Sequence, residues 1–173
     1  LLAIGVDFDL AAGALTLSGT SATDRVSVVG KSSYLDVYAD GGFHARLLNA
    51  NSSNVNSIAF SGGAGADSLA VQNIQLGGSL AIDLTDAETL SVLKSKNVAV
   101  NSNAALNLGM SSISGTLDII AGGGLTQTGQ VVVAGATTLD VAGSDITLAN
   151  AGNNFGTLSL TGAAQNVSLR DVN

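Results

Sequence analysis

The chain has 173 residues, which is long enough for one domain with a substantial core. Hydrophobic residues make up 46% of it, aromatic residues only 3%, and Trp, Pro and Cys are absent, so the core must consist of Val, Leu, Ile and Ala. The net charge is −7 and the six basic residues are scattered, which argues against nucleic acid as a partner, and no apolar run approaches the ~18 residues of a membrane-spanning helix.

Short segments in which apolar residues alternate with small or polar ones follow one another along the chain, as is typical of β-strands. In chain order these are "ALTL" (14–17), "RVSV" (25–28), "YLDV" (34–37), "ARLL" (45–48), "SIAF" (57–60), "SLAV" (68–71), "SLAI" (79–82), "TLSV" (89–92), "NVAV" (97–100), "ALNL" (105–108), "TLDI" (116–119), "VVVA" (131–134), "TLDV" (138–141), "DITL" (145–148), "TLSL" (157–160) and "NVSL" (166–169). Clusters of Gly, Asn and Ser separate them at regular intervals, which indicates turns rather than linkers. The segment 86–96, "DAETLSVLKSK", also fits a short helix capped by Asp86, but its alternation favours a strand.

Strands recur about every ten residues, and every second strand recurs after about twenty, which matches one coil of a solenoid. The sequence therefore predicts an all-β fold: a right-handed parallel β-helix of about eight coils, each of roughly 20 residues, with a length of roughly 35–40 Å. Leu117, Leu139 and Leu158 are expected to stack in one interior column, with Ile119, Val141 and Leu160 beside them. The alternative is a β-sandwich, which short strands at this spacing also permit.

Two parts of the chain resemble known families. Residues 122–173, with "LTQTG", "DITLANAGNNF" and "VSLRD", are similar to the repeats of large bacterial surface proteins of the filamentous-haemagglutinin type. Residues 13–30 and 55–71 are similar to giant surface proteins with RTX-like turns. The resemblance implies a right-handed parallel β-helix in an extracellular, non-enzymatic stalk or adhesin, and it does not identify a ligand.

The segment 62–70, "GGAGADSLA", fits the calcium-binding nonapeptide G-G-x-G-x-D-x-U-x at every fixed position. Backbone carbonyls of Gly63 and Gly65 and the carboxylate of Asp67 are therefore candidate calcium ligands. The related segment around Asp24 lies much earlier in the chain. At the predicted coil length, Asp24 and Asp67 would be two coils apart, which is too far for them to share an ion. We therefore favour the alternative interpretation, a glycine corner capped by Asp67, and expect no obligatory cofactor.

Two further sets of residues are candidates for chemistry. Asp118 in "TLDI" and Asp140 in "TLDV" occupy the same place in similar phrases, so their carboxylates are expected to lie about 5 Å apart on adjacent coils. Paired carboxylates can cleave glycosidic bonds, which makes a polysaccharide-binding or polysaccharide-cleaving β-helix the alternative function. No basic or aromatic residue accompanies either in sequence, so two solvated surface acids are the simpler reading. His44 is the single histidine, and without a second His or any Cys it predicts a turn or surface residue rather than zinc.

The sequence thus predicts a single β-helical domain over residues 1–173, as a segment of a longer or polymerised extracellular bacterial protein. We expect a structural or adhesive role without enzymatic activity, as a stalk or a filament subunit on the cell surface. The expected partners are neighbouring coils of the same protein or other copies joined end to end, together with a host surface or a polysaccharide, but neither nucleic acid nor membrane. Both ends carry apolar alternating runs, which favours end-to-end association.

Overall fold

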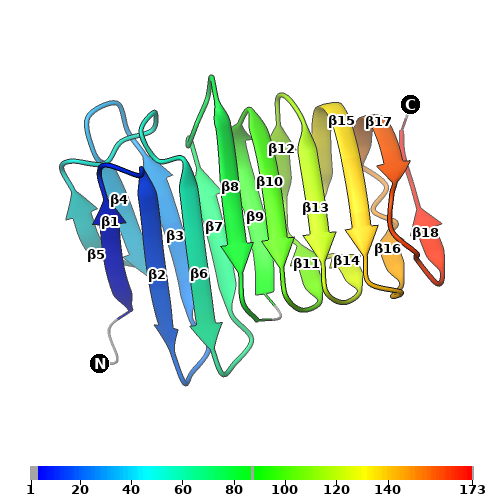
Figure 1. Ribbon diagram of the computed structural model, residues 1–173, viewed down its shortest axis with the longest axis horizontal. Coiled ribbons are helices and arrows are strands. Elements are labelled where there is room, and N and C mark those ends of the chain that lie inside the picture. The colour runs from blue at the N-terminus through cyan, green and yellow to red at the C-terminus, as the bar shows by residue number, and fades with distance from the viewer. Residues whose placement is uncertain (1–3, 87, 173) are drawn as a thin grey trace.

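The computed structural model describes residues 4–86 and 88–172 as a rod built of strands and turns, with the two ends of the chain at opposite ends of the rod (Figure 1). No helix occurs in these residues. There is accordingly no helix among them that is long and apolar enough to cross a membrane.

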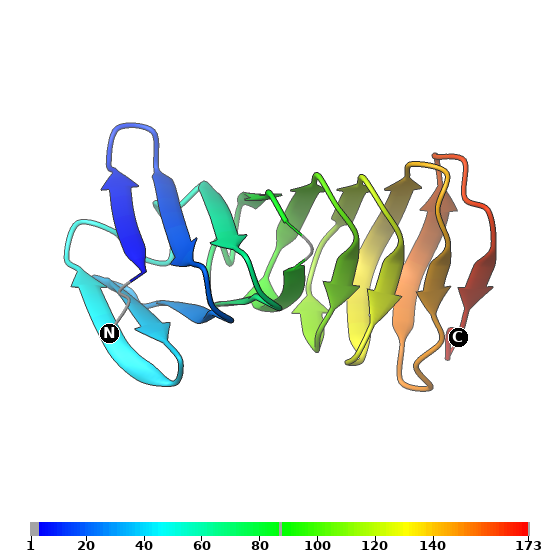
Figure 2. The same cartoon turned by 90° about the horizontal axis from the view of Figure 1, so that it is seen from below.

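The strands form two main stacks on opposite sides of the rod (Figures 1 and 2). The first stack contains β1 (Gly5–Asp9), β2 (Ala14–Thr20), β6 (Ser57–Gly63), β8 (Ser79–Leu84), β10 (Asn97–Ser102), β13 (Leu117–Ala121), the second half of β15 (Val131–Val141) and the second half of β17 (Asn154–Leu160). The second contains β5 (Gly42–Leu47), β4 (Leu35–Ala39), β3 (Arg25–Gly30), β7 (Ser68–Gln72), β9 (Glu88–Ser95), β11 (Leu106–Leu108), β14 (Leu125–Gln127), β16 (Ile146–Leu148) and β18 (Val167–Leu169). From the end of β9 onward, β12 (Ser111–Ile113) and the first halves of β15 and β17 form a third side.

From β2 onward, each strand of the first stack pairs in parallel with the strand one turn later. Ile58 pairs with Ile82, and the same column continues through Val100, Ile119 and Leu139, one member from each turn. Each of these side chains is buried. A column of aliphatic side chains at nearly constant spacing is what a parallel solenoid needs in order to fill a narrow core. The predicted all-β parallel solenoid is confirmed, the sandwich alternative is excluded, and the right-handed winding stays a prediction.

The cross-section of the rod changes at β9, which begins the switch from two strands per turn to three. The beginning of β9 pairs with β11 and its end pairs with β12, with a register shift between the last two pairs. Lys94, in the last part of β9, has a positive φ of 58° and lies at this irregularity. In the next turn two separate strands, β11 and β12, take the place of the single strand β9. Residues 86–96 thus contain a strand, as the alternation predicts.

The rod has fewer turns than the eight coils that the sequence predicts. The largest error lies in the first turn, where Leu15 pairs with Ile58 and not with a residue one predicted coil later. The intervening residues contain a hairpin, because β4 pairs antiparallel with β3 and β5 antiparallel with β4. Leu35, which the regular spacing assigns to a second coil, therefore belongs to this insertion.

The insertion also closes the N-terminal end of the rod. Strand β1 pairs antiparallel with β2, and the β4–β5 hairpin lies beside β3, so antiparallel strands cover the first turn in both stacks (Figure 2). Arg46 of β5 forms an ion pair with Asp36 of β4 at 2.7 Å, and its guanidinium lies 4.0 Å from the centre of the Tyr34 ring. Antiparallel strands therefore cover the first parallel turn of the described residues.

The predicted interior columns need a correction of register. Leu117 pairs with Thr137, which pairs with Leu158, whereas Leu139 pairs with Ile119 and Leu160. The phrase "TLDI" recurs as "TLDV", but its Ile119 pairs with the leucine of the later phrase and not with the valine. Similarity of phrase therefore misplaces the register, and Thr137 enters the core column with its hydroxyl unpartnered among the described residues.

Candidate functional site

Three acidic side chains stack at one corner of the rod, in the turns before it becomes three-sided. Asp24, Asp67 and Glu88 occupy the same position at the start of β3, β7 and β9, because the residues that follow them pair in register. Their exposed fractions are only 4%, 3% and 1%. In the next turn Leu106 pairs with Glu88, so an apolar side chain replaces the acid. We call Asp24, Asp67 and Glu88 the acidic column.

Each acid of the column accepts hydrogen bonds from a backbone N–H. The N–H of Thr20 donates to Asp24 Oδ2 at 2.6 Å, and the N–H of Asp24 donates to Asp67 Oδ1 at 2.7 Å. The N–H of Gly62 donates to Glu88 Oε1 at 3.2 Å. Two of these three bonds join adjacent turns, so the column fastens the corners of the rod to one another.

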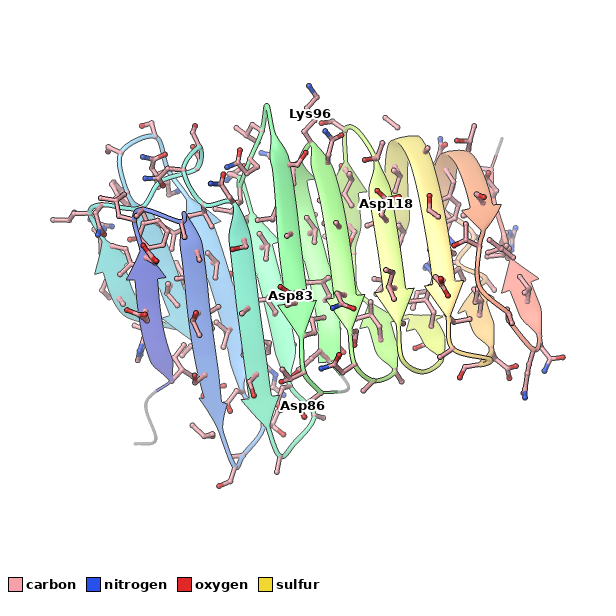
Figure 3. All side chains as sticks on the ribbon, in the orientation of Figure 1. Asp83, Asp86, Lys96 and Asp118 are labelled. Atoms are coloured by element: carbon pink, nitrogen blue, oxygen red, sulfur yellow. The ribbon has the colours of Figure 1, made fainter. Side chains whose placement is uncertain are left out.

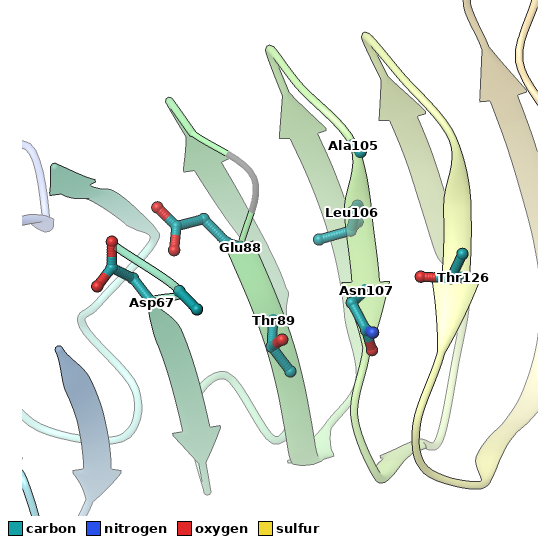
Figure 4. A pocket seen from close by; sticks show the side chains of 8 residues that line it. Asp67, Glu88, Thr89, Ala105, Leu106, Asn107 and Thr126 are labelled. Carbon is teal, nitrogen blue, oxygen red and sulfur yellow. The ribbon is translucent and has the colours of Figure 1, made fainter. Parts of the chain in front are cut away.

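Glu88 is less well satisfied than the two aspartates. Its Oε2 is buried and has no hydrogen-bond partner in the described part of the chain. Burial is the largest cause that raises the pKa of Glu88, to about 7; the Gly62 N–H lowers this pKa, and the negative charges of Asp67, Asp86 and Asp24 contribute to raising it. Figure 4 shows the carboxyl groups of Asp67 and Glu88 facing one another.

A pocket of about 140 Å³ opens beside the two acids, with Leu106, Asn107 and Thr126 on the walls contributed by the following turns (Figure 4). The pocket is therefore acidic on one side and neutral on the other. In the residues that the structure describes, no group of three or more His, Cys, Asp or Glu side chains has the arrangement needed to hold a metal ion.

The glycines of "GGAG" are explained by contacts between turns. Gly63 and Gly65 have positive φ values of 87° and 145°, which L-residues with a side chain rarely adopt. A Cβ at Gly63 would collide with the carbonyl oxygen of Thr20 in the preceding turn, and one at Gly62 would collide with the carboxyl group of Asp67. These glycines are thus needed for close packing at the corner whether or not an ion is present.

The expected distance between the two calcium-like segments is wrong. Asp24 and Asp67 lie on adjacent turns and not two coils apart, because the hairpin accounts for much of the chain between them. Asp67 Oδ1 accepts a hydrogen bond from the N–H of Asp24 in the preceding turn. The N–H of Gly63 donates to Asp86 Oδ2 at 3.3 Å. Calcium at Gly63, Gly65 and Asp67 stays a prediction.

Asp118 and Asp140 do not form the directly stacked pair that the sequence predicts. Asp118 pairs with Thr138, and Asp140 pairs with Ile120, so the two acids are diagonal neighbours on adjacent strands. Diagonal partners are separated by ~7–8 Å, more than the expected ~5 Å between direct partners. Both lie on the outer side of the first stack, where Figure 3 also shows Asp83. A shallow hollow of about 180 Å³ beside Asp118 is lined by Asn97 and Thr116 and not by Asp140.

His44 lies on β5, and its Nε2 is 3.0 Å from the carbonyl oxygen of Ile4. It borders a larger hollow of about 490 Å³ at the N-terminal end, together with Phe43, Asp40 and Asp24. His44 is half-buried within a strand, so it is neither the turn residue nor the freely exposed residue that the sequence suggests.

The residue that sequence reasoning missed is Glu88, which the pattern presents only as part of a strand or of a helix start. A signal was present, since Glu88 is the only glutamate in the chain and stands one turn after Asp67. The missing information was that the position is inward-facing, because a residue at the very start of a strand gives no sign of which way it points.

The comparisons with known proteins give one match. The family described as repeats of unknown function (DUF5649) matches residues 95–162, which is less than half of the chain. The matched residues run from the end of β9 past the end of β17, so they coincide with the three-sided turns. The chain is thus similar to a repeat family over the most regular part of the rod. No curated protein and no solved structure matches it.

Proposed function

We propose that this chain is a structural segment of an extracellular bacterial fibre or adhesin, and that it acts as a rod and not as a catalyst. The observation that carries the proposal is the difference between the two ends of the rod. Antiparallel strands close the first turn, while the interior columns run on to the last turn and stay uncovered there. The apolar columns that are exposed at the last described turn are a surface on which a further coil could pair.

The open end consists of the apolar side chains of β17 and β18. Leu160, Val167 and Leu169 pair with the buried Leu139, Ile146 and Leu148 of the preceding turn, yet their exposed fractions are 41%, 44% and 37%. They are the continuation of core columns. Their exposure leaves apolar surface and unpaired strand edges in water, which is unfavourable in an isolated rod.

We propose that a further coil of the same repeat covers this end, by parallel pairing with β17 and β18. The argument is continuity: the preceding pairs bring aliphatic residues into register once in every turn, and the last turn presents the same residue types at the same positions. Head-to-tail stacking of identical rods is less favourable than a continuing repeat, because the capped first turn offers no equivalent edge.

An adhesive contribution is supported by the hairpin β4–β5, which projects from the capped end. Its outer side carries Tyr38 and Phe43 in an edge-to-face contact with ring centroids 5.9 Å apart, and Arg46 lies over the Tyr34 ring. Phe43 is 60% exposed. Tyr, Phe and Arg are the residue types that dominate binding surfaces, and the rest of this chain has few of them.

The experiment compares Leu160→Lys combined with Val167→Lys against Ser159→Lys combined with Ser168→Lys, in which the same strands change on their outward side. In the wild-type chain 1–173, multi-angle light scattering should show association that grows with concentration. The inward-facing pair of lysines should abolish it, and the outward-facing pair should leave it. A wild-type chain that stays monomeric with a cooperative melt at all concentrations would refute the proposal.

A further inference from the structure

The acidic column places three carboxyl groups at one corner of the rod. Asp24, Asp67 and Glu88 come from successive turns, and each is at least nine-tenths buried. The charged groups that bear on Glu88 are Asp67 from the turn before β7, Asp24 from the turn before β3 and Asp86 from its own turn. On the other side, β11 contributes the apolar Leu106.

The hydrogen bonds of the three acids differ. The carboxylates of Asp24 and Asp67 each accept a short hydrogen bond from a backbone N–H, at 2.6 and 2.7 Å. Glu88 accepts one longer bond at Oε1, and its buried Oε2 has no donor in the described part of the chain. An ionised oxygen in that place lacks both water and a partner, which is costly.

We infer that Glu88 binds a proton at neutral pH, and that this proton stabilises the junction between the two-sided and the three-sided turns. Protonation removes one of three neighbouring negative charges and requires no movement of the backbone. The Gly62 N–H keeps its acceptor, because the carbonyl oxygen of a neutral carboxyl group still accepts. The folded rod is therefore more stable at mildly acidic pH than at alkaline pH.

The direction follows from proton linkage. The pKa of Glu88 is about 7 in the folded chain, against an ordinary value of 4.5, so the folded chain holds the proton more tightly than the unfolded one. The stabilising contribution is complete below the ordinary pKa and disappears as the pH rises through about 7. Stability should therefore fall between weakly acidic and weakly alkaline pH, where most other carboxyl groups no longer titrate.

The most direct test uses the fact that Glu88 is the only glutamate. Labelling with ¹³C-glutamate gives a single side-chain carboxyl resonance in the wild-type chain, which can be followed by NMR from acid to alkali. We expect a midpoint near 7, as burial among acids requires. A midpoint in the ordinary range of glutamate would overturn the inference, and this measurement needs no variant that might fail to fold.

The second test is the melting temperature as a function of pH. The wild-type melting temperature should fall by several degrees between about pH 5 and pH 8. The change Glu88→Gln, which imitates the neutral group, should flatten the curve and raise the melting temperature at pH 8. Asp83→Asn, an exposed acid on the outer side of β8, should keep the wild-type slope.

Two control experiments test whether another group causes the same dependence of melting temperature on pH. His44→Gln should leave the pH dependence unchanged, and its loss there would assign the effect to the histidine. Addition of millimolar calcium at pH 8 should not raise the melting temperature of the wild-type chain. A rise that Glu88→Gln removes would mean that the column holds a cation in place of a proton, and would overturn the inference.

Discussion

Alanine at Gly63 should destabilise the rod far more than alanine at Gly41, although the two glycines have almost the same backbone conformation. Their φ values are 87° and 80°. A Cβ at Gly41 meets nothing within 4 Å, whereas a Cβ at Gly63 collides with the carbonyl oxygen of Thr20 in the preceding turn. The pair of variants therefore separates the cost of the left-handed conformation from the cost of pushing two turns apart.

The magnitudes follow from these two contributions. A left-handed conformation costs an L-residue ~1–2 kcal/mol, which is the whole expected effect of Gly41→Ala. Gly63→Ala adds the cost of inserting a methyl group between turns, ~1–3 kcal/mol by analogy with overpacked cores. Thr20 and Gly63 form the last pair of the β2–β6 ladder, so the strain should be relieved by separating these ends. The difference corresponds to ~2–12 °C in melting temperature for a chain of this size.

Urea denaturation followed by circular dichroism measures both free energies of unfolding, in calcium-free buffer. The same ranking should persist when calcium is added, since the collision does not depend on an ion. If Gly63→Ala is no more destabilising than Gly41→Ala, the close approach of the two turns is wrong. If the penalty exists only in the presence of calcium, these glycines serve an ion site and not a packed corner.

Two other predictions concern the interior of the rod and the absence of catalysis. Asn153 is fully buried; its Oδ1 accepts a hydrogen bond from the N–H of Val131, and its Nδ2 donates to the carbonyl oxygen of Leu148. Asn153→Ala should therefore lower the free energy of unfolding, measured by urea denaturation, by ~1–3 kcal/mol. Asn107→Ala, which loses one exposed hydrogen bond from Thr128, should lower it by less than ~1 kcal/mol. Incubation with polygalacturonate and related polysaccharides should yield no cleavage products above a heat-inactivated control; products that disappear in Asp118→Ala or Asp140→Ala would contradict the structural role.

The alternation of apolar residues was sufficient to predict the strands and the parallel stacking. Small aliphatic residues that recur about every twenty residues, such as Val100, Ile119 and Leu139, have few other ways to form a core without aromatic side chains. The strand at residues 88–95 was also predictable, because Leu90 and Val92 alternate with Thr89 and Ser91. These features depend on local pattern, which the sequence records directly.

The hairpin, the register and the acidic column were not predictable in the same way. Alternation has the same form in parallel and antiparallel strands, so β4 and β5 look like solenoid strands in the sequence. Register in β15 depends on how many residues turn the corner before Thr137, and the alternation within the strand is unaffected by that number. The acidic column could not be predicted because Asp24 and Asp67 come to lie on adjacent turns only once the hairpin is recognised.

The position of the acidic column has a physical reason in the change of cross-section. In the two-sided turns, the backbone N–H groups of Thr20 and Gly62 donate to carboxyl groups at the corner before the second stack, to Asp24 and Glu88 respectively. Carboxyl groups satisfy those donors. In the three-sided turns Leu106 and Leu125 take the same place, and Leu106 pairs with Glu88 and with Leu125. Glu88 is therefore the last acid before the change to leucine, and its Oε2 is the buried carboxyl oxygen without a hydrogen-bond partner in the described part of the chain.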